Sequence, residues 1–191
     1  MADFEKLIPH IIKWEAGVVQ KQGETPEALF ERARKKGWAN DPNDLGGATQ
    51  TGVTIGAYRA YCRKHNISEP TVENLKQIPY ATWLAILKEN YWDRWKADQI
   101  MSQPIANMVV DWTWGSGVHG VKKPQEVLGV VPDGMVGPKT LAAVNSAGPV
   151  TLFHKLKARR IKFYEDIVKS RPSQKKWLNG WLNRVNDLKY E

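Results

Sequence analysis

The sequence predicts a mainly α-helical fold with a short irregular or β-containing loop at residues 40–54 and a C-terminal helical module from about residue 120. Apolar residues recur at helical spacing along most of the chain, one cluster of turn-forming residues interrupts them, and strand signals are scarce. The 191 residues fit one domain, or one domain with a small appendage. An apolar fraction of 42% and nine tryptophans exclude a disordered chain.

The N-terminal segment is predicted as an amphipathic helix capped by Asp3. Its apolar residues follow the i, i+3, i+4, i+7, i+8 spacing of one helix face: Phe4, Leu7, Ile8, Ile11 and Ile12. Glu15 falls on this face, near the helix end before Gly17. Burial among apolar side chains favours a protonated carboxyl, which is the form that a general acid needs. Spacing alone favours the alternative, a structural salt bridge with an arginine, over the acid role.

The segment after Thr25-Pro26 is predicted as a second helix, which ends near Gly37. From residue 40 to 52 the sequence NDPNDLGGATQTG is dense in turn formers and predicts an irregular loop that can include a short strand pair. Carboxylates and hydroxyls lie beside two glycines in this loop: Asp41, Asp44, Gly46, Gly47, Thr49 and Thr51. Such a loop can bring backbone close to a ligand and position a water molecule, or it can be a set of Asx turns without chemistry.

Helical patterns fill the rest of the chain. Thr54 and Thr71 are predicted N-caps, and another helix follows Pro79. Residues 105–114 predict a buried helix interrupted only by Asn107 and Asp111, which share one face. Residues 121–145 predict a helix, a VPDGMVG turn and a second helix, and two basic helices separated by a proline follow.

Several site classes have no support in the sequence. The segment from Asp41 lacks the ligands that a calcium loop needs at positions 5 and 12, and the four histidines form no zinc motif. No phosphate-binding loop occurs, so we expect no metal and no organic cofactor. Cys62 is the single cysteine, which excludes an intramolecular disulfide. Charges in the first 14 residues and the lack of a long apolar run lead us to expect neither a Sec signal peptide nor membrane insertion.

The net charge of +8 is concentrated at the C-terminal end. Residues 150–191 contain eleven Lys/Arg and four Asp/Glu, a net +7, whereas residues 1–149 contain seventeen and sixteen. A basic segment of this kind favours an anionic partner such as nucleic acid, a membrane surface or a wall polymer, and a solvated helix face is the alternative. No nucleic-acid recognition motif accompanies the charge, so nucleic-acid binding is not expected.

Three separate motifs resemble those of the glycoside hydrolase 108 muramidases, the endolysin-type and secretion-activator-type lysozymes. WEAGV at 14–18, NDPNDLGGAT at 40–49 and TGVT at 51–54 resemble the E-G-G-Y and D-D-P-G-G-A-T-x-x-G-I-T signature. The resemblance continues through YW at 91–92, IAN at 105–107 and Asp111. VPDGMVGPKTL at 131–141 and KWLNGWLNRV at 176–185 are similar to the small helical peptidoglycan-binding module that accompanies the family.

The resemblance implies a lysozyme-like fold, with a muramidase domain at 1–119 and a helical peptidoglycan-binding-like module at 120–191 packed on it. It implies hydrolysis of the β-1,4 bond between N-acetylmuramic acid and N-acetylglucosamine, with Glu15 as the catalytic acid and Asp44 and Thr49 in supporting roles. Substrate contacts are expected from five further residues: Gly46, Gly47, Trp92, Asn107 and Asp111. Most of the tryptophans are expected in the core.

The sequence departs from the family pattern near Glu15. Ala16 and Val18 replace a glycine and a tyrosine, and about twenty residues, 20–39, separate the glutamate from the aspartate loop. The alternative function is therefore a catalytically weak wall-binding or secretion-accessory protein that retains the fold. Peptidoglycan binding and simple packing also stay equally open for the C-terminal module.

The expected partner is the glycan strand of peptidoglycan, and the expected oligomeric state is a monomer. The resemblance implies synthesis in the cytoplasm and action in the periplasm or cell wall. A holin, a secretion system or cell lysis is the expected export route.

Overall fold

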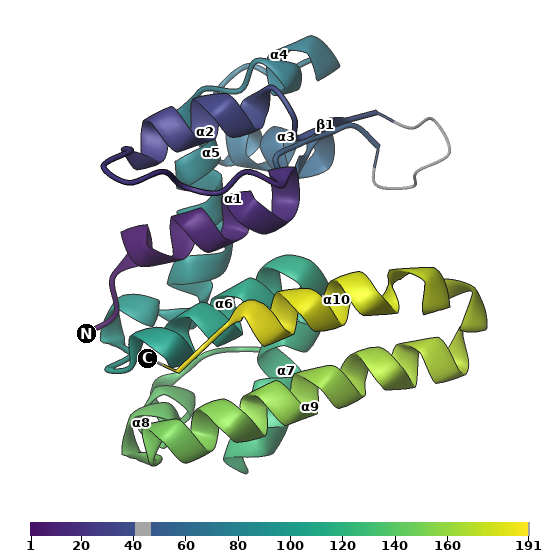
Figure 1. Cartoon of the computed structure of the whole chain (residues 1–191). Coiled ribbons are helices and arrows are strands. Elements are labelled where there is room, and N and C mark those ends of the chain that lie inside the picture. Colours follow the sequence, from purple (N-terminus) through teal and green to yellow (C-terminus); the bar gives the residue numbers. More distant parts are fainter. Residues whose placement is uncertain (41–46, 191) are drawn as a thin grey trace. The chain divides into compact units, whose positions relative to one another are not determined.

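The structure is a computed structural model that describes residues 1–40 and 47–190. It divides into two compact units, which are described separately: Phe4–Asn90, and Tyr91–Glu191 together with Met1–Asp3. Figure 1 shows the order of the elements along the chain. None of the helices in the described part of the chain has the length and apolarity needed to cross a bilayer.

The Phe4–Asn90 unit consists of short helices and one small sheet. Its helices are η1 (Phe4–Leu7), α1 (Ile8–Ala16), α2 (Pro26–Arg34), α3 (Ile55–Lys64), α4 (Val72–Lys76) and α5 (Tyr80–Leu87). Helix α1 packs on α2, and α2 packs on α5. Their apolar faces form the core, in which Phe30 and Trp83 are fully buried with ring centroids 5.0 Å apart.

The N-terminal helix is split where the sequence predicted one continuous helix. Residues 4–7 form a 3-10 helix, and the α-helix begins at Ile8. Pro9 explains the split, because proline has no N–H with which to continue the hydrogen bonding of the preceding turn. The predicted caps at Thr54 and Thr71 are confirmed, since each side chain accepts a backbone N–H of the following turn. Thr25, at the predicted start of the second helix, caps α2 in the same way.

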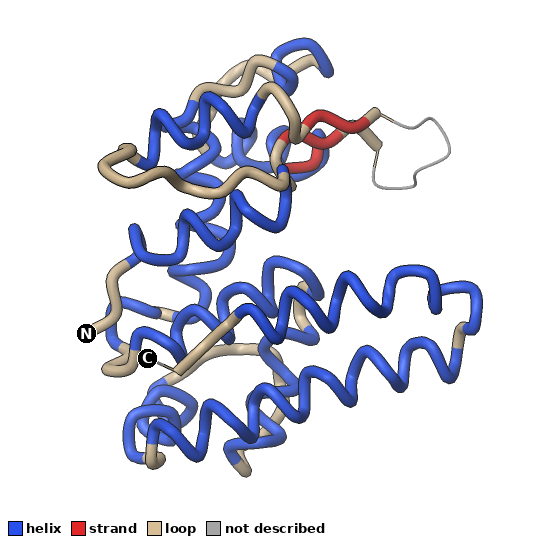
Figure 2. The backbone as a smooth tube through the Cα atoms, viewed as in Figure 1, coloured by secondary structure: helices blue, strands red, loops and turns tan. Residues whose placement is uncertain are grey.

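The sheet has three antiparallel strands in the order β1-β2-β3: β1 (Trp38–Ala39), β2 (Thr49–Gln50) and β3 (Val53–Thr54). They are the red segments of Figure 2. Thr49 of the central strand faces Ala39 on one side and Thr54 on the other. Strands β2 and β3 are joined by Thr51 and Gly52, with φ of 47° and 79°, the signs that a tight hairpin turn requires.

In the described part of the Tyr91–Glu191 unit, the regular secondary structure consists of helices. A π-helical turn, η2 (Lys88–Trp92), contains the division between the units and leads to η3 (Asp93–Trp95) and η4 (Ala97–Gln99). The main helices are α6 (Gln103–Ser116), α7 (His119–Leu128), α8 (Pro138–Ser146), α9 (Pro149–Ser170) and α10 (Lys175–Asp187), with η5 (Pro172–Gln174) before α10. In Figure 1, α9 and α10 run side by side, in agreement with their extensive contacts.

Helix α6 is the central helix of this unit. It packs against α7 and α9, and it buries a continuous set of residues: Ile105, Ala106, Met108, Val109, Val110, Asp111, Trp112 and Thr113. Gly120 allows α7 to approach α6, because a Cβ atom at this position would lie only 2.3 Å from the backbone nitrogen of Thr113. Gly120 is therefore required by the packing of the two helix backbones.

The prediction of a mainly helical fold is confirmed. Strands β2 and β3 lie within the predicted range 40–54, whereas β1 (Trp38–Ala39) precedes it. The compact units divide between Asn90 and Tyr91. The predicted domains 1–119 and 120–191 are defined by sequence motifs rather than by compactness, and they stay a prediction.

Candidate active site

Glu15 lies in the last turn of α1, as predicted. The helix ends at Gly17, whose φ of 64° is left-handed and whose N–H donates to the carbonyl of Lys13. Ile8, Ile11 and Ile12 on the same helix are fully buried, whereas Glu15 itself is half-buried. A carboxyl in this position is held by a rigid helix and keeps part of its surface exposed, which is what a proton donor to a substrate needs.

Thr49 lies in the central strand of the sheet and is half-buried. Gly47 precedes it with a φ of 66°, a left-handed conformation that favours glycine. Asp44 and Gly46, the other predicted site residues of this loop, lie outside the described residues, as does Asp41. Glu15 and Thr49 therefore belong to the same compact unit, and the segment that carries Asp44 leads directly into the strand of Thr49.

Two buried polar residues next to Thr49 anchor the hairpin. Gln50 is 1% exposed, and its Nε2 donates to the carbonyl of Lys76 at 2.8 Å. Thr51 is fully buried, donates through Oγ1 to Gln50 at 3.2 Å, and accepts the indole N–H of Trp83 at its carbonyl. Its N–H also donates to the carbonyl of Gly37. Gln50 is not among the predicted site residues, although a glutamine beside a turn is compatible with such an anchor.

The segment 20–39, which separates Glu15 from the loop, contains α2 and β1, and α2 packs against α1. Arg32 of α2 donates to both carboxylate oxygens of Glu24, from Nε at 2.6 Å and from Nη2 at 2.7 Å. The N–H of Lys21 also donates to this carboxylate, at 2.9 Å. The hydrogen bond from Arg32 lowers the pKa of Glu24 from 4.5 to about 2. These bonds fix the path of the chain between α1 and α2.

Val18, which replaces the tyrosine of the resembled motif, is 4% exposed. Position 18 is thus part of the apolar core. Trp38, an aromatic residue near the loop, is half-buried in β1, with the Nζ atom of Lys76 5.9 Å from its ring centroid. Cation–π attraction between the Lys76 ammonium group and the Trp38 ring stabilises the position of the ring.

Two of the predicted substrate contacts lie in the Tyr91–Glu191 unit with side-chain partners of their own. Trp92 is fully buried, and its indole N–H donates to Oδ1 of Asp98 at 2.7 Å. Asn107 is half-buried and accepts a hydrogen bond from Nε2 of Gln103 at 2.8 Å. Trp92 and Asn107 belong to a different compact unit from Glu15, and their roles in substrate binding stay predictions.

Asp111, the third predicted contact in this unit, is fully buried between two arginines. Its Oδ2 lies 2.8 Å from Nη1 of Arg160, which is also fully buried, and its Oδ1 accepts from Nη2 of Arg184 at 2.7 Å. Asp111 therefore connects α6 to α9 and α10. The arginines were missed because each is one of many basic residues on its helix, and only their positions on the inner faces of amphipathic helices distinguish them.

The Asp133-Gly134 turn of the C-terminal module is built around Gln125 of α7. Oε1 of Gln125 accepts the N–H of Gly134, and its Nε2 donates to Oδ1 of Asp133, both at 2.9 Å. The N–H of Met135 also donates to Asp133, and this bond, with that from Gln125, lowers the pKa of the carboxyl. Gly134 has a φ of 84°, a left-handed conformation that favours glycine, and a Cβ there would lie 2.7 Å from Cγ2 of Val118. The motif thus has a structural role of its own.

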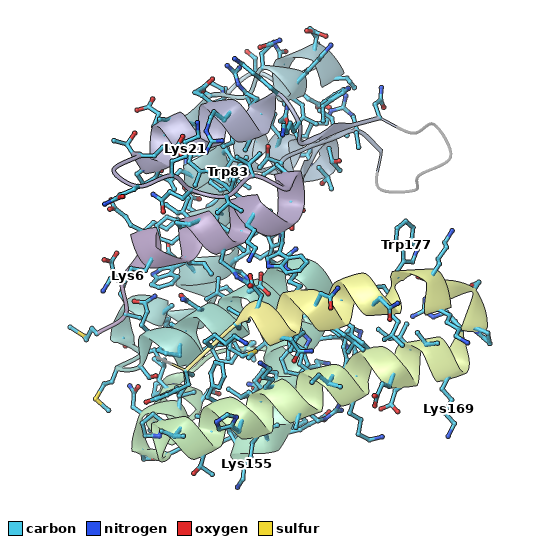
Figure 3. All side chains as sticks on the ribbon, viewed as in Figure 1. Lys6, Lys21, Trp83, Lys155, Lys169 and Trp177 are labelled. Carbon is cyan, nitrogen blue, oxygen red and sulfur yellow. The ribbon has the colours of Figure 1, made fainter. Side chains whose placement is uncertain are left out.

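Apart from Arg160 and Arg184, several basic side chains of α9 and α10 are exposed. Lys155 and Lys169 project from α9 into solvent in Figure 3, and Trp177 of α10 is 53% exposed. Within residues 1–40 and 47–190, no three His, Cys, Asp or Glu side chains are grouped so that they could hold a metal ion.

Two family descriptions match adjacent parts of the chain. Residues 32–117 match "Glycosyl hydrolase 108", and residues 119–186 match "Predicted Peptidoglycan domain". Among solved structures, that of Brucella abortus SagA is similar, with a TM-score of 0.72 and 25% identity over 97% of this chain and 90% of that chain. A comparison with curated proteins gives no match.

The matched regions cover most, but not all, of the predicted site. The first region includes the positions of Asp44, Thr49, Trp92, Asn107 and Asp111, and it begins after Glu15. The predicted function of the Glu15 motif therefore depends on the resemblance of residues 14–18 to the E-G-G-Y motif and on the position of Glu15 in α1. The likeness to a solved structure over almost the whole chain includes α1 and the C-terminal helices.

Proposed function

We propose that this peptidoglycan hydrolase cleaves the β-1,4 bond between N-acetylmuramic acid and N-acetylglucosamine. The basis is that residues 32–117 match the glycosyl hydrolase 108 family and residues 119–186 match the predicted peptidoglycan domain family. The observation that carries the proposal is the position of Glu15, a half-buried carboxyl at the end of α1, in one compact unit with the strand of Thr49. In this mechanism the Glu15 carboxyl protonates the glycosidic oxygen as the bond to the anomeric carbon breaks. Asp44 and Thr49 orient a water molecule or stabilise the oxocarbenium-like transition state.

The test replaces the acid and identifies the bond. Purified peptidoglycan is incubated with the wild type and Glu15→Gln, and new reducing ends are reduced with borohydride before mass spectrometry. A muramidase produces reduced muramic acid ends, whereas a glucosaminidase produces reduced glucosamine ends. We expect reduced muramic acid from the wild type and a loss of about 10²–10⁴-fold in Glu15→Gln, the range of general acid catalysis.

Glu27→Gln is the matched control, because Glu27 is an exposed glutamate in the first turn of α2 in the same unit. It should retain wild-type activity. Equal activity in Glu15→Gln and Glu27→Gln would remove Glu15 from the mechanism. Reduced glucosamine ends would overturn the assigned bond.

A catalytically weak wall-binding or secretion-accessory protein is the second candidate. It is favoured by one observation, namely that the hydrolase family match begins at residue 32 and leaves the Glu15 motif outside. Binding of the wild type to sedimented peptidoglycan, with no reducing ends released, would select this function over hydrolysis.

The place and mode of action are also part of the proposal. We propose a monomer that is made in the cytoplasm and acts on glycan strands in the periplasm or cell wall, as an endolysin-type or secretion-accessory enzyme. Release through a holin or a secretion system would deliver it. Fractionation of cells that express the protein, with and without such a pore, tests this part.

A further inference from the structure

A cavity of about 550 Å³ lies within the Tyr91–Glu191 unit, between α6, α7, α9 and α10. Its lining combines aromatic rings with cations: His119, Arg160, Phe163, Tyr164, Arg171, Trp181 and Arg184 are among the residues that form it. No aspartate or glutamate is among the described residues that line it. The volume is within the range of pockets that bind small molecules.

Arg160 forms part of the cavity wall and has one hydrogen-bond donor without an acceptor. The side chain is fully buried, and its Nη1 lies 2.8 Å from Asp111, while its Nε donates to the hydroxyl of Tyr164 at 3.2 Å. Its Nη2 is buried and has no hydrogen-bond partner among residues 1–40 and 47–190. A buried guanidinium N–H without an acceptor is costly and rare in native proteins, so this atom indicates an acceptor that binds from the cavity.

Two more arginines contribute to the same cavity. Arg184 lies 2.7 Å from Oδ1 of Asp111, the carboxylate that also pairs with Arg160. Arg171, at the end of α9, is exposed, and among the described residues no carboxylate is paired with it. Guanidinium groups bind carboxylates through two parallel hydrogen bonds, which makes a carboxylate the chemically matched ligand.

The aromatic residues form a continuous wall beside these cations. The ring centroids of Phe163 and Tyr164 are 5.5 Å apart, and those of Tyr164 and Trp181 are 5.2 Å apart. His119 extends the row, at 5.5 Å from Phe163. Such a wall covers the aliphatic part of a ligand whose charged end reaches the arginines.

We propose that this cavity binds a carboxylate of the peptidoglycan stem peptide, with the arginines receiving the carboxylate and the aromatic wall covering the aliphatic side chain beside it. The choice of ligand rests on the proposed function, because peptidoglycan is the proposed substrate. In a peptide-substituted glycan strand the lactyl carboxyl is used in an amide bond, so the free carboxylates belong to the peptide. The cavity therefore recognises a different part of the polymer from the bond that is cut.

The test measures binding to the full-length protein by isothermal titration calorimetry. The ligands are a soluble disaccharide-tetrapeptide, the same compound with its carboxyl groups converted to amides, and the neutral chitotetraose. The disaccharide-tetrapeptide carries the product end of the proposed reaction, so it is not consumed. We expect amidation to weaken binding at least tenfold.

Ser116 offers a matched pair of variants, because it lines the cavity at the end of α6 and is half-buried. Ser116→Glu puts a competing carboxylate into the cavity and should weaken binding of the acid form at least tenfold. Ser116→Gln has the same size without the charge and should change it less than threefold. Arg171→Gln, at an exposed position, is the second variant if Ser116→Glu fails to fold, and it should weaken binding at least threefold.

Equal affinity for the acid and the amide, or equal affinity of Ser116→Glu and Ser116→Gln, would overturn the proposal. Release of reducing ends by the wild type is measured in parallel. Release without carboxylate-dependent binding would overturn the cavity proposal alone, and carboxylate-dependent binding without release would overturn the hydrolase alone.

Discussion

The indole Nε1 of Trp83 donates a hydrogen bond to the backbone carbonyl of Thr51 at 3.0 Å, and both residues are fully buried. This bond connects α5 to the turn between β2 and β3. Thr51 has a φ of 47°, a conformation that costs a non-glycine residue about 1–3 kcal/mol, so surrounding contacts must maintain it. Thr49 lies two residues earlier, and its position thus depends on a tryptophan in the core of the unit.

Trp83→Phe should destabilise the fold and lower the activity together. The phenylalanine keeps most of the aromatic packing but leaves the Thr51 carbonyl without its donor, which costs about 1–3 kcal/mol. Denaturant unfolding followed by circular dichroism measures the loss. Trp177→Phe is the control, because Trp177 is 53% exposed, and it should change stability by less than about 0.5 kcal/mol. Equal effects of the two variants would show that the hydrogen bond is unimportant.

Gly37→Ala and Gly180→Ala should change stability in opposite directions. A Cβ on Gly37 would lie 2.7 Å from Oγ1 and 3.0 Å from Cα of Thr51, so the sheet must shift, at a cost of about 1–3 kcal/mol. Gly180 lies inside α10 with nothing within 4 Å of an added Cβ, so alanine should stabilise the helix by about 0.5–1 kcal/mol. Thermal unfolding of both variants tests the pair, and destabilisation by Gly180→Ala would contradict it.

Thr49→Val should lower kcat about 10²-fold with little change in KM if the hydroxyl acts on the water or the transition state. Valine has nearly the same shape and a high preference for strands, so the sheet should remain intact. Thr49→Ser retains the hydroxyl and should keep most of the activity. The rates are measured as reducing ends released from peptidoglycan. A rate for Thr49→Val equal to that of Thr49→Ser would exclude a role for the hydroxyl.

The Glu24–Arg32 pair predicts a loss of stability in acid. The folded-state pKa of Glu24 is lowered from 4.5 to about 2 by the hydrogen bond from Arg32, so the folded protein holds the charged form more strongly than the unfolded chain does. The resulting stability is fully present above pH 4.5 and is lost as the pH falls towards 2. Unfolding measured across this window should therefore show a decline that is smaller in Glu24→Gln. A parallel decline in both proteins would contradict the prediction.

Asp111→Asn should destabilise the Tyr91–Glu191 unit strongly. Removing the carboxylate leaves the buried Arg160 without its ion-pair partner, and breaking a buried pair in this way costs about 3–5 kcal/mol. Asp166→Asn is the control, because its pair with Lys162 is on the surface of α9, where the side chains are 52% and 67% exposed. It should cost less than about 1 kcal/mol. Comparable stabilities of the two variants, in denaturant unfolding, would argue against a structural role for Asp111.

The helical part of the fold could be predicted because its signals are local. The capping threonines and the apolar face of residues 4–12 each fix one element without reference to distant residues. The split of the first helix at Pro9 was missed although the proline was visible, because the apolar spacing continues through it. The strand at Trp38 was also missed, since two residues give no periodic pattern.

The candidate site was predictable only in part. The position of Glu15 followed from helical spacing, since Ile8 and Ile11 fix the face on which it lies. The burial of Asp111 between Arg160 and Arg184 did not follow, because the partners are 49 and 73 residues away and pair only through tertiary packing. Gln50 and Thr51 were not distinguishable from ordinary turn residues for the same reason.

The join between the two family matches lies at Gly117–His119, within a single compact unit. Helix α6 ends on one side of this join, α7 begins on the other, and Gly120 holds the two backbones in contact. A chain cut at residue 118 would expose the buried face of α6, including Val109 and Trp112, to solvent. The two regions therefore cannot be exchanged independently. An engineered chimera that contains the C-terminal region of this chain should also contain its α6.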